Sequence, residues 1–169
     1  ISQLNFENVG IDADQIVATG DDAEQLIKDA INYGTLCVSA EAVGCMESCY
    51  LKTVEYTKSR EQFGQPISNF QVLQHKMVDM FIEAELCKSL LYKSMIDMHE
   101  NNDSKYRSVS ALKSQVGLSG KKVGEDAVQL HGGMGVSEEM SIGHYLKRFI
   151  SIDSQFGNSH FHLKKFNNS

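Results

Sequence analysis

The chain has 169 residues, of which 41% are hydrophobic and 22% charged, and its formal net charge is −6. This length and apolar content suit one compact domain and exclude a disordered chain. The acidic balance argues against nucleic-acid binding, which normally needs a basic surface. No run of about 18 apolar residues is present and the first residues show no signal-peptide pattern, so we expect no membrane span and a cytoplasmic protein.

The four cysteines carry no metal-site or disulfide pattern. Cys45 and Cys49 stand four residues apart in an apolar helical pattern, with no histidine at ligand spacing beside them. This arrangement predicts small buried thiols and no metal site.

The first twenty residues differ from the rest of the chain. Leu4, Phe6 and Val9 are apolar in a polar setting and precede a glycine, a pattern that predicts a last strand and its exit turn. A lone strand has no partner here. We therefore interpret residues 1–20 as the remnant of a preceding β-domain with its linker, and residues 21–169 as a helical bundle domain.

Long helices are predicted for most of the remaining chain. Pro66 is the only proline, and apolar residues recur at steps of three and four. This periodicity predicts helices over about 23–58, 68–99 and 104–130, with a loop at 59–68. Three glycines thin one face of the third helix and predict a close neighbour, for which we expect a second subunit: Gly117, Gly120 and Gly124.

Two shorter helices are predicted after the glycine-rich break at 131–135. Ser137 has the character of an N-cap, with Glu138 and Glu139 in the first turn of a helix that ends near residue 152. A last helical stretch follows Gly157. The whole pattern predicts an all-α fold, an up-down four-helix bundle with an extra short C-terminal helix.

Two stretches carry residues suited to binding a phosphate group. The first, Arg60–Gly64, combines a guanidinium, which bonds phosphate oxygens in a forked geometry, with an aromatic ring that can cover an adenine. The second, Gln129–Gly135, has glycines that let backbone N–H groups approach a phosphate. Each stretch alone fits equally well a surface arginine or a simple helix stop. In an up-down-up bundle the first and third helices run parallel, so we expect both stretches at the same end.

The same two stretches resemble a known family. YTKSREQFGQPI at 56–67 and AVQLHGGMGV at 127–136, followed by Tyr145 and the Lys147–Arg148 pair, are similar to the C-terminal domain of flavin-dependent acyl-CoA dehydrogenases. The resemblance extends over about residues 4–166. A chain of this family is more than twice as long and carries two further domains, which are essentially missing here.

The resemblance implies a cofactor, a substrate and partners. The family oxidises acyl-CoA to trans-2-enoyl-CoA: a glutamate removes the α-proton, FAD accepts a hydride, and electrons pass to an electron-transfer flavoprotein. It implies assembly into homo- or hetero-oligomers of acyl-CoA dehydrogenase subunits. It further implies two groups of FAD contacts, one across a subunit interface (Arg60, Gln62, Phe63) and one at the pyrophosphate and adenosine end (Gln129, Gly132, Gly133).

The chain departs from the family at both positions where the catalytic glutamate is found. The later position corresponds to Gly157 and the earlier one to Gly34, with Thr35 in place of the usual arginine. Glu41 lies two turns further along the same helix, as either a displaced base or an ordinary polar contact. We therefore expect a partner subunit that lacks the base, and no dehydrogenation by this chain alone. The alternative is a non-catalytic helical assembly module.

Overall fold

The structure is a computed structural model that describes residues 3–168. Its helices are α1 (Gly20–Ser59), α2 (Gln71–His99), α3 (Lys105–His131), α4 (Ile142–Ser154) and α5 (Ser159–Asn167). Between them lie short elements: η1 (Ala13–Gln15), β1 (Glu61–Gln62), β2 (Gln65–Pro66), η2 (Ile67–Asn69) and η3 (Gly132–Val136). The predicted all-α fold is confirmed, and no helix of the described part is long and apolar enough to cross a membrane.

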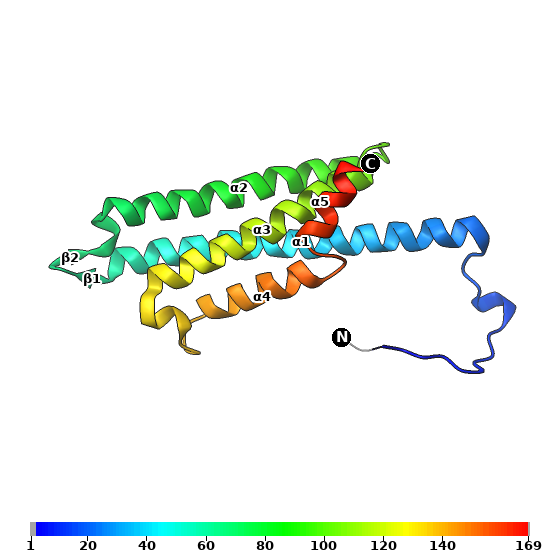
Figure 1. The fold of residues 1–169 in the computed structure, drawn as a ribbon, viewed down its shortest axis with the longest axis horizontal. Helices are drawn as coiled ribbons and strands as arrows, with labels where there is room; N and C mark the ends of the chain where they lie inside the picture. Colours follow the sequence, from blue (N-terminus) through cyan, green and yellow to red (C-terminus); the bar gives the residue numbers. More distant parts are fainter. Residues whose placement is uncertain (1–2, 169) are drawn as a thin grey trace.

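Helices α1, α2 and α3 run up, down and up, and α4 turns back along α1 and α3 (Figure 1). α3 is the central element, because it contacts all four other helices. The N-terminal turns of α1 extend beyond the bundle (Figure 1). The core is built from the apolar stripes of these helices, including Met46, Cys49, Met80, Cys87, Leu112, Val116, Val123, Phe149 and Ile152.

The glycine face of α3 is covered within the same chain. A Cβ atom at Gly120 would lie 3.1 Å from Cδ1 of Phe149, and one at Gly124 would lie 3.0 Å from the side chain of Leu146. The close neighbour predicted at this face is therefore α4, and the expectation that it serves a second subunit is wrong. Small residues on α3 allow α4 to approach without a void.

Two local predictions are also wrong. Residues 3–11 form no strand, and Leu4, Phe6 and Val9 are exposed, because no strand lies beside them to pair with their backbone. The assignment of residues 1–20 to a preceding domain remains a prediction. α4 begins at Ile142 with Ser141 as its N-cap, four residues later than expected. Glu138 lies before the helix and forms an ion pair with Lys147 at 3.0 Å.

Candidate functional site

A cleft of about 440 Å³ lies where α1 and α3 end, and we call it the α1–α3 cleft. The parallel course of these helices brings the two phosphate-type stretches together there, although they are about 70 positions apart in sequence (Figure 1). Of the six predicted FAD contacts, Phe63 alone is outside the lining, which consists of Tyr56, Arg60, Gln62, Ile67, Gln129, Leu130, His131, Gly132, Gly133 and Met134.

A tight hairpin follows α1 and carries one side of the cleft. Glu61 pairs with Pro66 and Gln62 with Gln65, so Phe63 and Gly64 form the two-residue turn. Both have positive φ values, 55° and 79°, as the commonest two-residue hairpin turn requires. This conformation strains Phe63, whose side chain is 92% exposed and meets Phe70 edge-on with 6.1 Å between ring centroids. The hairpin thus presents Phe63 outward, away from the chain's own core.

The guanidinium of Arg60 is available for a ligand. Its backbone closes α1, with its N–H donating to the carbonyl of Tyr56 at 2.8 Å. Its side chain forms no ion pair within the described residues, whereas Arg148 is held by Glu41. An unpaired guanidinium at the wall of a cleft suits a phosphate or carboxylate.

The glycine turn after α3 forms the opposite wall. Gly132 ends the helix at φ 58° and ψ −137°, a conformation that is essentially restricted to glycine. A Cβ atom at Gly133 would meet nothing within 4 Å. Open space beside a glycine backbone lets a bulky anionic group approach the peptide N–H groups closely.

A stacked pair, Tyr56 and His131, joins the two walls. Their rings are 4.1 Å apart between centroids and inclined by 21°. The Tyr56 hydroxyl donates to the His131 carbonyl at 3.4 Å, and His131 Nδ1 lies 2.8 Å from the carbonyl oxygen of Ala127. Burial lowers the pKa of His131, so the ring is neutral at pH 7. Sequence reasoning did not select this pair, although Tyr56 precedes Arg60 by one helical turn and so shares its face.

The two positions expected for a catalytic base lie together elsewhere. A Cβ atom at Gly34 would lie 2.7 Å from Cζ of Phe156, the residue before Gly157. Phe156 is strained, with φ 56°, and its ring covers Gly34. The space beside Gly34 is therefore filled by an aromatic ring and not by a carboxylate.

A buried lysine holds this second site in place. Lys113 on α3 is fully buried, and its ammonium group donates to the carbonyls of Ile152 (2.9 Å), Asp153 (3.0 Å) and Gly157 (2.9 Å). His162 Nε2 lies 3.0 Å from the carbonyl oxygen of Phe156. The turn between α4 and α5 is thus fixed by α3 and α5, a role for Lys113 that no motif indicated.

Glu41 forms an ion pair with Arg148. Its carboxylate accepts two bonds from Arg148, at 2.6 Å and 2.7 Å. The Arg148 guanidinium holds the pKa of Glu41 below its usual value. A general base needs a pKa closer to the working pH, so the geometry favours an ordinary ion pair.

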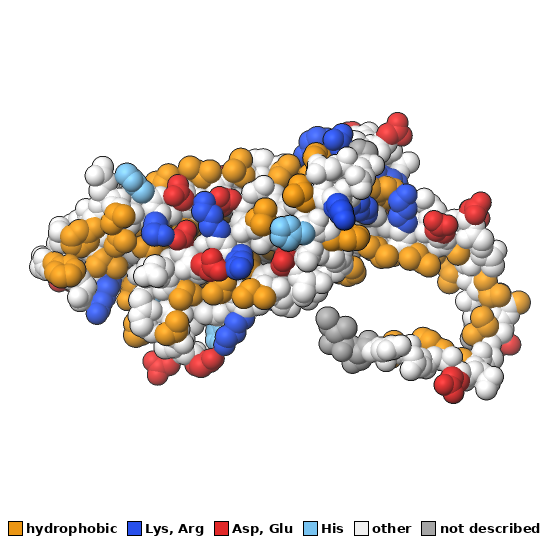
Figure 2. Space-filling model, viewed as in Figure 1, with side chains coloured by type: hydrophobic (Ala, Val, Ile, Leu, Met, Phe, Trp, Pro, Cys, Tyr) orange, Lys and Arg blue, Asp and Glu red, His pale blue; other side chains and the backbone are white. Residues whose placement is uncertain are grey.

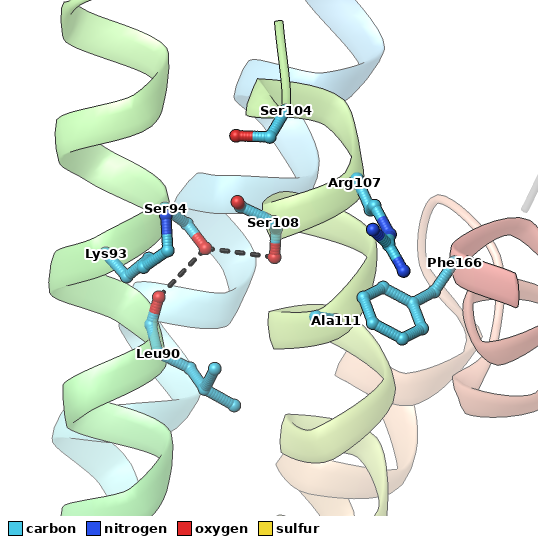
Figure 3. A pocket seen from close by; sticks show the side chains of 8 residues that line it. All are labelled: Leu90, Lys93, Ser94, Ser104, Arg107, Ser108, Ala111 and Phe166. Atoms are coloured by element: carbon cyan, nitrogen blue, oxygen red, sulfur yellow. Dashed lines mark hydrogen bonds between the residues drawn. The ribbon is translucent and has the colours of Figure 1, made fainter. Parts of the chain in front are cut away.

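A cavity of about 460 Å³ lies at the opposite end of the bundle, where α2 ends and α3 begins (Figure 3). Several of its polar groups already have partners within the chain: Lys93 and Ser108 both donate to Asp97. The Ser94 hydroxyl donates to the carbonyls of Leu90 (2.8 Å) and Ser108 (3.0 Å), and Arg107 lies over the Phe166 ring at 4.5 Å (Figure 3). The α1–α3 cleft combines an arginine with an exposed glycine backbone, which the other cavity lacks, and is therefore the better candidate for binding an anion.

Comparison with known proteins agrees with the helical fold. Residues 25–164 match the family described as "Acyl-CoA dehydrogenase, C-terminal domain". A short-chain-specific acyl-CoA dehydrogenase of Megasphaera elsdenii is 29% identical over 147 residues, which cover 86% of this chain and 38% of that protein.

Solved structures give the same result. The butyryl-CoA dehydrogenase of Megasphaera elsdenii superposes with a TM-score of 0.79 and 28% identity, over 82% of this chain and 36% of that one. The structure described as PigA with FAD and proline superposes with a TM-score of 0.79 and 25% identity, over 83% of this chain and 37% of that one. The chain thus spans little more than a third of the length of these relatives.

Proposed function

Because this chain belongs to the acyl-CoA dehydrogenase family, as its C-terminal helical domain, we propose that it binds FAD in the α1–α3 cleft and joins subunits of such an enzyme. One observation carries the proposal: two stretches that are far apart in sequence line one cleft, with an unpaired arginine on one wall and an open glycine turn on the other.

The cleft residues fit the cofactor's pyrophosphate and adenosine end. Arg60 and Gln62 supply donors from the hairpin, and Gln129, Gly132 and Gly133 supply side-chain and backbone groups from the end of α3. Phe63 points outward and would contact FAD across a subunit boundary. Flavin, when bound, supplies the acceptor for a hydride.

Subunit pairing is supported by the uncovered face of α2. Val78, Phe81, Ile82 and Leu86 recur at helical spacing and are each about half exposed, and hydrophobic side chains gather along α2 on the surface (Figure 2). A row of this kind normally marks a protein interface. We expect a dimer or a dimer of dimers.

For the whole enzyme we propose oxidation of acyl-CoA to trans-2-enoyl-CoA, with an electron-transfer flavoprotein as electron acceptor. Phe156 over Gly34 and the ion pair of Glu41 support a subunit without a catalytic base, working beside a subunit that has one. Proton abstraction needs a base within about 2.6–3.2 Å of the proton donor.

The second candidate function is an assembly module without a cofactor. The exposed row on α2 would serve it equally well. FAD binding decides between the two, because a pure assembly module has no need of Arg60 in an open cleft.

The test is FAD retention by the complex purified with co-expressed partner subunits. Replacing an arginine that bonds a phosphate costs about 1.5–3 kcal/mol, so Arg60→Ala should weaken FAD binding roughly tenfold or more. Arg107→Ala is the matched control, because Arg107 lies in the first turn of α3, at the end of the bundle opposite to Arg60 (Figure 1). Unchanged FAD occupancy in Arg60→Ala, with the helices intact by circular dichroism, would reject the site.

A further inference from the structure

The ring of His131 has a buried nitrogen atom to which no described residue forms a hydrogen bond. The residue is 3% exposed and ends α3. Nδ1 lies 2.8 Å from a carbonyl oxygen, which can only accept, so Nδ1 carries the proton of the neutral ring. Nε2 is then a hydrogen-bond acceptor, and within the described residues nothing donates to it. Buried polar atoms are nearly always bonded, so this acceptor is an exception that calls for a donor.

The ring is held as part of the cleft wall. Stacking on Tyr56 fixes its plane, and the bond to Ala127 fixes its rotation. It lines the α1–α3 cleft and also an adjoining pocket formed with Lys52, Glu55, Glu139 and Ser141. The charged residues that line these two pockets together with His131 are Lys52, Glu55 and Arg60 from α1 and Glu139 from the segment before α4.

We propose that His131 Nε2 accepts a hydrogen bond from the nucleotide that binds in the α1–α3 cleft. The inference rests on the proposed function and adds a contact to it. The pyrophosphate of FAD has no proton to donate at neutral pH. With the adenosine end of the cofactor in the cleft, the donors on offer are the ribose hydroxyls and the amino group of adenine. Different residues of the cleft then bind different parts of the nucleotide. Arg60 and the glycine turn bind phosphate oxygens, while His131 binds the sugar or the base.

The acceptor nitrogen gives a reason for a histidine at position 131 rather than another aromatic residue. A phenylalanine would stack on Tyr56 equally well but would offer no acceptor. An oriented ring that is already desolvated loses little freedom when the ligand arrives.

The first test uses two substitutions that separate the ring nitrogens. His131→Asn keeps a donor near Nδ1 for the Ala127 carbonyl and removes Nε2, and His131→Gln keeps an amide oxygen near Nε2. Titration of the chain with ADP should show a loss of about threefold to tenfold for His131→Asn, the size expected of one neutral hydrogen bond. His131→Gln should restore most of the affinity.

The control is the other buried histidine. His162 is 1% exposed and also has one ring nitrogen that is unpaired in the described part of the chain, but it lies on α5 beside Phe156. His162→Asn therefore imposes a similar loss of a buried ring away from the cleft, and ADP affinity should stay unchanged.

Nucleotide analogues identify the donor. IDP lacks the adenine amino group and 2′-deoxy-ADP lacks one ribose hydroxyl. The analogue that lacks the relevant donor should bind to wild type with the same loss as ADP shows with His131→Asn, and the substitution should cost that analogue nothing further.

The pH dependence gives a readout that a purely structural role would not move. The pKa of His131 lies below the ordinary value of 6.5, so the acceptor is present at pH 7 and is lost as the ring is protonated at lower pH. ADP affinity of wild type, divided by that of His131→Asn, should stay constant above pH 6.5 and fall as the pH drops through the lowered pKa of the ring. A ratio that rises instead would mean that a protonated ring serves the phosphates.

That rise, or equal ADP affinity for wild type and His131→Asn, overturns the inference. If Arg60→Ala weakens ADP binding while His131→Asn does not, the inference fails and the proposed site stands. If wild type binds neither ADP nor FAD, both fail.

Discussion

Two turns of this molecule contain a phenylalanine with nearly the same strained backbone, and they use it in opposite ways. Phe63, at φ 55°, stands at the tip of the hairpin with its ring 92% exposed. Phe156, at φ 56°, lies in the turn between α4 and α5, with its ring on Gly34 and its turn held by Lys113. Strain at Phe156 is offset by contacts inside the chain. Strain at Phe63 is offset by few contacts within the chain, which is typical of a residue that contacts a ligand or another subunit.

The largest expected effect comes from removing Lys113, which holds the turn between α4 and α5. Lys113→Met leaves three buried carbonyl oxygens without their donor, and we expect the free energy of unfolding to fall by about 3–5 kcal/mol. Urea denaturation followed by circular dichroism measures it. Lys121→Met, on the exposed side of the same helix, should stay within about 0.5 kcal/mol of wild type. Equal effects of the two substitutions would show that the carbonyl contacts of Lys113 add nothing.

The same substitution at the two phenylalanines compares the turns directly. Glycine relieves the backbone strain at either position, but Phe156→Gly also removes a ring that rests on α1. We expect Phe156→Gly to be less stable than Phe63→Gly by about 2 kcal/mol in thermal and urea unfolding. Phe63→Gly should instead lower FAD retention in the assembled complex. If Phe63→Gly lost as much stability as Phe156→Gly, the Phe63 ring would also support the fold, contrary to our interpretation.

A smaller effect on stability is expected from a substitution at Gly34, the residue that the Phe156 ring covers. Gly34→Ala puts a methyl group 2.7 Å from Cζ of that ring, and we expect it to lie about 1–3 kcal/mol below Gly44→Ala in stability. Gly44 is on the same helix with open space around it, so alanine there should stabilise by up to about 1 kcal/mol. In a Phe156→Gly background the cost of Gly34→Ala should disappear; if it persists, the ring is not its cause.

The smallest effect concerns Glu41. Its folded pKa is lower than its unfolded one, so the stability it contributes is present above the unfolded value near 4.5 and is lost as pH falls through the folded pKa. The pair is partly exposed, and Glu41→Gln should therefore cost less than about 1 kcal/mol at pH 7. Unfolding at pH 7 and pH 3 measures this, and the cost should be smaller at the lower pH. If Glu41→Gln in the assembled enzyme abolished turnover of an acyl-CoA, Glu41 would be the base after all.

The long helices and the shared location of the two motifs followed from the sequence alone. Helical periodicity is a local property, so the apolar steps over 23–58, 68–99 and 104–130 predicted α1, α2 and α3 within a few residues. Because the first and third helices of an up-down-up bundle run parallel, Arg60 and Gln129 were expected at the same end without any knowledge of packing.

Only the tertiary structure decided what fills the space against α3 and beside Gly34. The course of α4 determines that Phe149 covers Gly120 within one chain, that Lys113 meets three carbonyls from residues 152–157, and that Phe156 rests on Gly34. These contacts join residues about 30 to 120 positions apart in sequence. No local pattern encodes such pairs, because each depends on where a later helix folds back over an earlier one.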